Sequence, residues 1–101
     1  MTVTKTLGGD TLTIKADGWL DTLTSPEFHK ETEDLKGAKN VILDFGGIEY
    51  ISSAGLRETV ALYRRVSETG GSFSVRNVKA KVMDVFTTTG FDKKIDIRTE
   101  D

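Results

Sequence analysis

Two adjacent serines and a nearby glycine, within the segment Tyr50–Leu56, have the residue types and spacing that best favour a function. Ser52 and Ser53 precede the longest amphipathic helix that the sequence predicts, where backbone N–H groups are unpaired and the helix dipole is positive. A phosphate on Ser53 would be stabilised there, and it would add about two negative charges at pH 7. Gly55, which has no side chain, lets another group approach the first helical turn closely. The spacing leaves open a simpler interpretation, in which Ser53 caps the helix and Gly55 is a close-packing residue.

The rest of the sequence offers few residues for catalysis. It contains no cysteine, which excludes a disulfide, a thiolate metal site and a cysteine nucleophile, and its one histidine is His29. A single histidine without cysteines cannot form a metal cluster of the zinc type. No serine lies in a nucleophile-elbow pattern, and Gly46-Gly47 is not followed by the Gly-Lys-Ser/Thr of a phosphate loop. We therefore expect no enzyme activity, no metal ion and no cofactor.

The composition indicates an ordinary globular domain. The 101 residues are enough for one domain, expected over 1–101, and too few for two. The 16 acidic and 14 basic residues give a net charge of −2, which disfavours direct binding of nucleic acid. The first residues lack the apolar core of a signal peptide, and no apolar stretch is long enough to span a membrane. We expect a cytoplasmic protein with no membrane partner.

The first part of the chain has the pattern of a β-hairpin followed by a loop. Polar and apolar residues alternate over 2–7 and 11–15, and a Gly-Gly-Asp turn separates the two segments. Such alternation around a short turn predicts two antiparallel strands. Residues 16–23 are expected to form a loop, with Trp19 packed at its rim.

The next part predicts a helix and a buried strand. The helix extends from 24 to 37, with Thr24 or Ser25 as its cap and Pro26 in its first turn. The apolar run 40–45 predicts a strand covered on both faces, and Gly46-Gly47 is expected to end it.

The remainder alternates helix and strand. The periodicity predicts a helix over 54–68, a strand over 72–75, a helix over 79–88 and a strand over 95–98. The order ββαβαβαβ implies an α/β fold with a mixed, mostly parallel sheet. The periodicity does not decide whether the helices lie on one face of the sheet or on both.

The segment from Val41 to Arg65, with its strand, Gly-Gly turn, serine motif and amphipathic helix, resembles the STAS domain of anti-sigma factor antagonists. The resemblance spans nearly the whole chain and implies the STAS fold. Other segments fall where that family has similar residues: Gly18-Trp-Leu-Asp21, Thr22–Pro26, Gly70-Gly71 and Thr89-Gly90-Phe91.

The resemblance implies a switch at the serine motif. In that family, a serine kinase that is also an anti-sigma factor phosphorylates a serine before the second helix. The unphosphorylated antagonist binds this kinase and frees the sigma factor, and a metal-dependent serine phosphatase reverses the modification. The usual pattern is Asp-Ser-Ser/Thr-Gly-Leu. Aligned on Gly55-Leu56, the acceptor is Ser53, while Ser52 replaces the aspartate and Ala54 the second hydroxyl residue.

The same resemblance implies a partner-binding surface around the acceptor. Asp21 matches an acidic residue of the family's earlier segment and is expected either to contact the kinase or to cap its own loop. Arg57 lies on the second helix, part of which belongs to the partner surface in this family. The expected partner-binding residues are Asp21, Ser52, Ala54, Gly55 and Arg57.

Two other functions remain open from the sequence. In one, the STAS fold is kept without the switch, as an adaptor in a signalling complex or a lipid-transport system. In the other, the chain is an enzyme or nucleotide-binding protein that holds a phosphate at the helix start near Gly55, although no lysine or metal-holding carboxylate is placed to support it.

Overall fold

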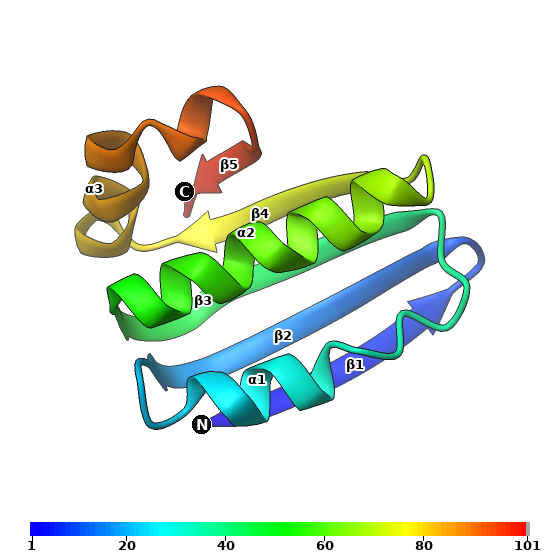
Figure 1. Cartoon of the computed structure of the whole chain (residues 1–101), viewed down its shortest axis with the longest axis horizontal. Helices are drawn as coiled ribbons and strands as arrows, with labels where there is room; N and C mark the ends of the chain where they lie inside the picture. Colours follow the sequence, from blue (N-terminus) through cyan, green and yellow to red (C-terminus); the bar gives the residue numbers. More distant parts are fainter. Residues whose placement is uncertain (101) are drawn as a thin grey trace.

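A computed structural model describes residues 1–100 as one five-stranded sheet with three α-helices (Figure 1). The strands are β1 (Thr2–Gly8), β2 (Thr11–Leu20), β3 (Asn40–Ile51), β4 (Ser72–Val78) and β5 (Asp96–Thr99). The helices are α1 (Ser25–Glu31), α2 (Ser53–Glu68) and α3 (Ala80–Thr89), and a short 3-10 helix, η1 (Phe91–Lys93), follows α3. The predicted α/β fold and its order of elements are confirmed.

The strands lie in the sheet in the order in which they occur in the chain, β1-β2-β3-β4-β5. β1 and β2 form the predicted antiparallel hairpin, and every later neighbouring pair is parallel. Each parallel pair is joined through a helix, as crossover connections require. The carboxyl ends of β2 and β3 therefore lie together at one end of the sheet, and the start of α2 lies beside them.

β2 and β3 are both longer than the sequence predicted. Residues 16–20, expected in a loop, belong to β2, and β3 continues past Gly46-Gly47 to Ile51. The two extensions pair with each other, with shifts in register that the alternation of side chains does not reveal. Gly47 permits this pairing because a Cβ there would lie 1.7 Å from Asp17 Oδ1.

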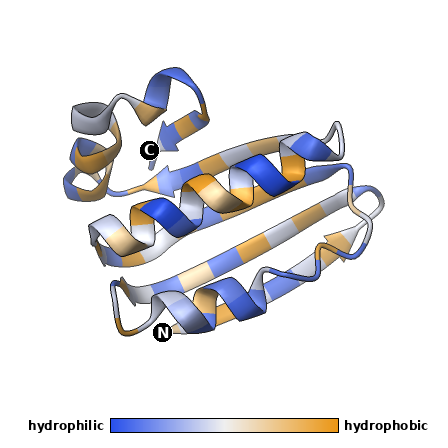
Figure 2. Ribbon diagram, in the orientation of Figure 1, coloured by the Kyte–Doolittle hydropathy of each residue, from blue (hydrophilic) through white to orange (hydrophobic). Residues whose placement is uncertain are grey.

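All three helices contribute to a core on one face of the sheet. The Phe45 ring of β3 lies 6.5 Å from Phe28 of α1 and 6.4 Å from Phe86 of α3, so both helices contact the same strand side chain. Apolar and polar residues alternate along the strands (Figure 2). The prediction that 40–45 is covered on both faces is wrong: Val41 is buried, whereas Ile42 is only half-buried, because none of the helices in residues 1–100 lies over the other face.

Helix α1 is shorter than predicted, and the other two helices agree closely with prediction. Thr32 ends α1, and its hydroxyl donates to the carbonyl of Phe28 at 2.8 Å. Arg65 of α2 donates to the Thr32 carbonyl and hydroxyl, at 3.3 and 3.1 Å, and thereby ties the end of α1 to α2. Within residues 1–100, no helix has both the length and the apolar character needed to cross a membrane.

Candidate functional site

The end of β3 and the end of β2 bring two of the expected site segments together. Leu20 and Ile51 are partners in the sheet, so Asp21 and Ser52, which follow them, leave the sheet side by side. The backbone N–H of Ser52 donates to the Leu20 carbonyl at 2.9 Å. We call this region the carboxyl end of the sheet. No hydrogen bond joins Asp21 to Ser53 within residues 1–100.

Ser52, and not Ser53, caps helix α2. Its φ of −95° and ψ of 177° are those of a residue just outside a helix, and its hydroxyl accepts a hydrogen bond from Gly55 N at 3.3 Å. Ser53 is the first helical residue and its side chain is exposed. Within residues 1–100 its hydroxyl makes no hydrogen bond. The interpretation of Ser53 as a cap is therefore wrong, and its hydroxyl has no structural role that modification would disturb.

Gly55 packs against the protein's own strand β2. It is buried, and a Cβ there would lie 2.5 Å from the carbonyl oxygen of Leu20 and 2.9 Å from Ile51 Cγ1. The close-packing interpretation is confirmed. Because β2 occupies the space beside Gly55, a ligand phosphate has no room at this point. Gly55 acts on the site by holding the start of α2, and with it Ser53, against the sheet.

Asp21 stabilises the loop that leads into α1. Its Oδ1 atom accepts hydrogen bonds from the N–H groups of Leu23 and Thr24, at 3.0 and 3.1 Å. The Thr24 hydroxyl donates to the Trp19 carbonyl at 2.8 Å, and α1 has no side-chain cap of its own. The loop-capping role of Asp21 is thus present. Thr24 occupies the expected cap position of α1, but its side chain makes no cap hydrogen bond. An Asp before a Thr-x-Pro helix start was the signal for this turn.

Three large apolar side chains in or next to these segments are exposed. Trp19 lies in β2, where sequence reasoning expected a loop, and its ring centroid is 5.1 Å from that of Tyr50 in β3. Trp19, Tyr50 and Leu23 are 58%, 46% and 89% exposed. The sequence analysis missed Tyr50 and Leu23. Strand alternation with the buried Ile51 was the signal for Tyr50, and large exposed aromatic groups are typical of protein interfaces.

Within residues 1–100, some of the charged side chains near the site form ion pairs with each other, and Arg57 does not. Glu58 of α2 is 2.9 Å from His29 of α1. The hydrogen bond from Lys81, at 3.2 Å, holds the pKa of the exposed Glu49 carboxyl below its usual range. Arg57 is exposed and makes no ion pair within residues 1–100. No group of three histidine or carboxylate side chains in the part of the chain that the structure describes lies close enough to hold a metal ion.

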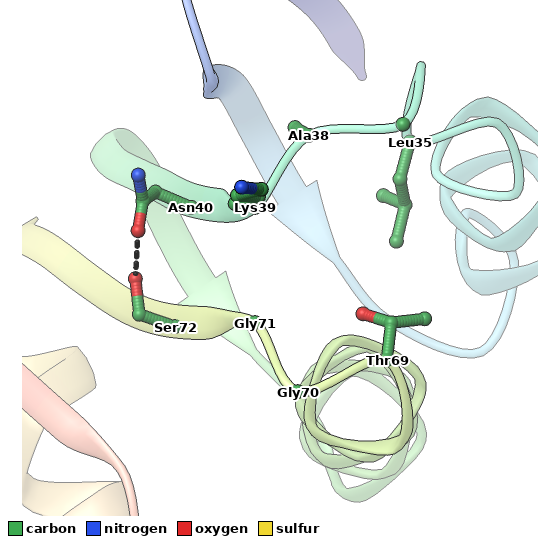
Figure 3. Close-up of a pocket in the computed structure, with 9 residues that line it drawn as sticks. Leu35, Ala38, Lys39, Asn40, Thr69, Gly70, Gly71 and Ser72 are labelled. Atoms are coloured by element: carbon green, nitrogen blue, oxygen red, sulfur yellow. Dashed lines mark hydrogen bonds between the residues drawn. The ribbon is translucent and has the colours of Figure 1, made fainter.

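A wide hollow lies at the other end of the molecule. It has a volume of about 730 Å³ and lies between the starts of β3 and β4 and the end of α2 (Figure 3). Lys39 is its one charged lining residue, and its rim holds a 2.7 Å hydrogen bond from the Ser72 hydroxyl to Asn40. None of the expected site residues contributes to it.

Comparison with known proteins identifies the family and supports the fold. The model of the STAS domain family matches residues 2–100. BtrV of Bordetella bronchiseptica, named as a candidate anti-sigma factor antagonist, is 38% identical over 56 residues, which cover 55% of this chain and 48% of BtrV. The match thus spans about half the length of that relative.

Two solved structures have the same fold. A protein of Thermotoga maritima, described as a candidate anti-sigma factor antagonist, has a TM-score of 0.88 and 23% identity, and the match covers 95% of this chain and 85% of that one. The Bacillus cell fate determinant SpoIIAA in its phosphorylated form has a TM-score of 0.74 and 16% identity, with 98% and 93% covered.

Proposed function

Because the chain belongs to the STAS domain family, we propose that it is an anti-sigma factor antagonist switched by phosphorylation of Ser53. In this proposal the unphosphorylated chain binds a serine kinase that is also an anti-sigma factor. The sigma factor is released, and transcription is controlled indirectly. A metal-dependent serine phosphatase, which holds its own metal, restores the binding form. These partners act in the cytoplasm, and we place the chain there.

The free hydroxyl of Ser53 is the observation that carries the proposal. Ser52 supplies the cap of α2, so Ser53 can change chemically without loss of a helix-stabilising bond. Its side chain is exposed, as an acceptor must be to enter a kinase site. The solved structure of phosphorylated SpoIIAA supports the idea that this fold can carry the modification.

The chemical step follows ordinary phosphoryl transfer. The Ser53 Oγ atom attacks the γ-phosphorus of ATP held by the kinase, the bond between that phosphorus and the ADP oxygen breaks, and ADP leaves. The hydroxyl proton passes to a base of the kinase. In the dephosphorylation step, catalysed by the phosphatase, water attacks the phosphorus, the bond to the Ser53 oxygen breaks, inorganic phosphate leaves, and the serine hydroxyl is restored.

The phosphate would change the surface charge while the fold stays the same. It would lie at the positive end of the α2 dipole, beside the unpaired N–H groups of the first turn, which stabilise an anion. It would also add about two negative charges to the exposed start of α2. A partner that binds this region would meet a charged group in place of a hydroxyl, and its affinity would fall.

A second candidate function rests on Ser52. This residue provides a cap and no charge next to the acceptor, whereas the family pattern commonly has an aspartate there. A STAS adaptor without a phospho-switch, in a signalling complex or a lipid-transport system, would need only the exposed surface and not the acceptor.

Mass spectrometry of the protein isolated from its own cells, before and after phosphatase treatment, separates the two functions. We expect a fraction with one added phosphoryl group on the peptide that contains Ser53, lost on treatment and absent in Ser53→Ala. Ser67→Ala is the matched control, because Ser67 is an exposed serine on the same helix. The adaptor function would be favoured if the protein never carried a phosphoryl group under conditions in which the anti-sigma serine kinase is active.

A further inference from the structure

An apolar groove with a basic rim lies between α2 and η1. Its volume is about 270 Å³, and Phe91 of η1 forms one wall. Leu56 and Val60 form its floor, and both are largely buried. We name this feature the α2–η1 groove, with the following lining: Leu56, Arg57, Val60, Ala61, Arg64 and Phe91.

Two arginines give the groove its charge. Arg57 and Arg64 are seven residues apart on α2, so they lie on one side of the helix about two turns apart. Both are exposed, and neither takes part in an ion pair within residues 1–100. The groove has no acidic lining residue, although the whole chain has a net charge of −2. Its charge is therefore complementary to an acidic ligand and opposite to that of the protein as a whole.

The shape of the groove favours a helix as its occupant. The lining residues of α2 recur at the spacing of one helix face, so the groove runs along the helix axis. Its volume is just below the range of small-molecule sites, about 300–1,000 Å³. An amphipathic helix places apolar side chains at successive turns into such a groove, with charged residues at its rim. Arginine guanidinium groups bind carboxylates with two parallel hydrogen bonds.

We infer that the α2–η1 groove binds an acidic amphipathic helix of the protein partner. Apolar side chains of that helix would enter between Ala61 and Phe91, and its carboxylates would pair with Arg57 and Arg64. This inference rests on the proposed function for the nature of the partner, and it adds a docking site beside the phosphorylated serine.

Arg57 connects the groove to Ser53. It lies four residues after Ser53, and both side chains are exposed, so they occupy the same side of α2 one turn apart. A negative group on the N-terminal side of a positive one, at this spacing, is the favoured orientation for a helix ion pair. A phosphate on Ser53 draws Arg57 toward itself and away from the groove. The modification thus lowers the affinity of the groove for an acidic helix without a change of fold.

Selection of peptides from a random helical library against the full chain tests the groove without the natural partner. We expect the selected peptides to combine Leu or Ile at helical spacing with an excess of Asp and Glu. In NMR spectra of the labelled protein, they should shift the amide signals of Ala61, Arg64 and Phe91. Selected peptides that lack the acidic excess or map to Trp19 and Tyr50 would overturn the inference, as would a failure to recover any binder.

Variants of the groove then test its chemistry on a selected peptide. Arg57→Glu and Arg64→Glu should each weaken binding by about tenfold or more, because a like charge replaces an attractive one. Lys30→Glu, at an exposed cation of α1 outside the groove, is the control and should change binding by less than about twofold. Ala61→Phe should fill the groove and block binding at constant charge. If that variant does not fold, the arginine variants decide. Dodecanoate, which has an apolar chain and one carboxylate, tests whether the groove binds a small lipid instead of a helix. The inference would be overturned if the arginine variants bound the peptide as tightly as the control does and dodecanoate occupied the groove.

A double-mutant cycle separates this inference from the phospho-switch. Ser53→Glu should lower the affinity for the peptide several-fold in the parent protein and in Arg64→Gln. The loss should be far smaller in Arg57→Gln, where the arginine one turn from residue 53 is absent. Equal effects in all three backgrounds would overturn the coupling. If the peptide binds in the groove and native Ser53 is never phosphorylated, the proposed function fails while the groove remains. If phosphorylation controls the partner but no acidic peptide binds, the groove fails alone.

Discussion

The two ends of the sheet use their polar groups in different ways. At the amino end, beside the large hollow, backbone and side chains bond to one another: Ser72 N donates to the Lys39 carbonyl at 2.8 Å, and the Ser72 hydroxyl donates to Asn40 at 2.7 Å. At the carboxyl end, Ser53 keeps an unbonded hydroxyl, and Trp19 and Leu23 are exposed. The larger hollow is thus at the end whose polar groups are already paired with one another. The proposed function therefore rests on an exposed group that is unbonded in the part of the chain that the structure describes, and not on the size of a hollow.

Among the variants that test this difference between the two ends, Gly55→Ala at the carboxyl end should have the largest effect, a loss of stability. Its Cβ would lie 2.5 Å from the backbone carbonyl oxygen of Leu20 and 2.9 Å from Cγ1 of the buried Ile51, which leaves little room to relax. We expect a loss of about 1–3 kcal/mol in the free energy of unfolding, measured by urea denaturation, after a helix-propensity gain of up to about 1 kcal/mol. Ala54→Gly, the reverse change one residue earlier, is the control and should cost no more than about 1 kcal/mol. A Gly55→Ala protein as stable as the parent would show that the start of α2 is not held by this contact.

The second effect concerns binding. Ser53→Asp should lower the affinity for the anti-sigma partner by about tenfold or more, which corresponds to about 1.4 kcal/mol of binding free energy. Ser53→Ala should bind that partner as tightly as the parent does. Both variants should unfold at nearly the same urea concentration as the parent, because Ser53 makes no cap hydrogen bond. Pull-down followed by titration calorimetry measures the affinities. If the Asp and Ala variants bound the partner with equal affinity, Ser53 at the carboxyl end would not be a phosphorylation switch.

The third effect distinguishes the two serines. Ser52→Ala should lose the hydrogen bond from Gly55 N and cost about 1 kcal/mol of stability. Ser52→Asp should retain the parent's stability, because a carboxylate also caps a helix and interacts favourably with its dipole. Thermal unfolding followed by circular dichroism checks this order. If Ser53→Ala were the more destabilising of the two alanine variants, the assignment of the cap would be wrong.

The smallest effect should come from the amino end. Ser72→Ala removes the exposed hydrogen bond to Asn40, and we expect a loss of about 0.5–1 kcal/mol in stability. Partner affinity should stay within about twofold of the parent, because this end lies far from Ser53 along α2. A loss of affinity similar to that of Ser53→Asp would mean that the partner also covers the hollow, and the contrast between the two ends would not hold.

The positions of the helices could be predicted from the sequence more fully than the lengths of the strands. The starts of α2 and α3 agree with prediction because their apolar spacing and flanking residues are local signals. The extensions of β2 and β3 could not be predicted, because Gly46-Gly47 and Gly18 resemble turn residues. The pairing of residues 17–20 with residues 47–51 is what makes these extensions part of the sheet. The loop cap by Asp21 was one of the two roles that the sequence left open, and the path of the loop shows that the N–H groups of Leu23 and Thr24 are its donors.

The sequence by itself determined the α/β order, the amphipathic α2 and the serine motif at its start, because these depend on residues close together in the chain. Only the tertiary structure decided that Ser52 is the cap, while the Ser53 hydroxyl bonds to nothing in residues 1–100. It also decided that Leu20 fills the space beside Gly55 and that the Trp19 ring lies 5.1 Å from that of Tyr50. These features depend on the register between β2 and β3 and on the contact of β2 with α2. Such contacts join residues far apart in the chain, and no local pattern specifies them.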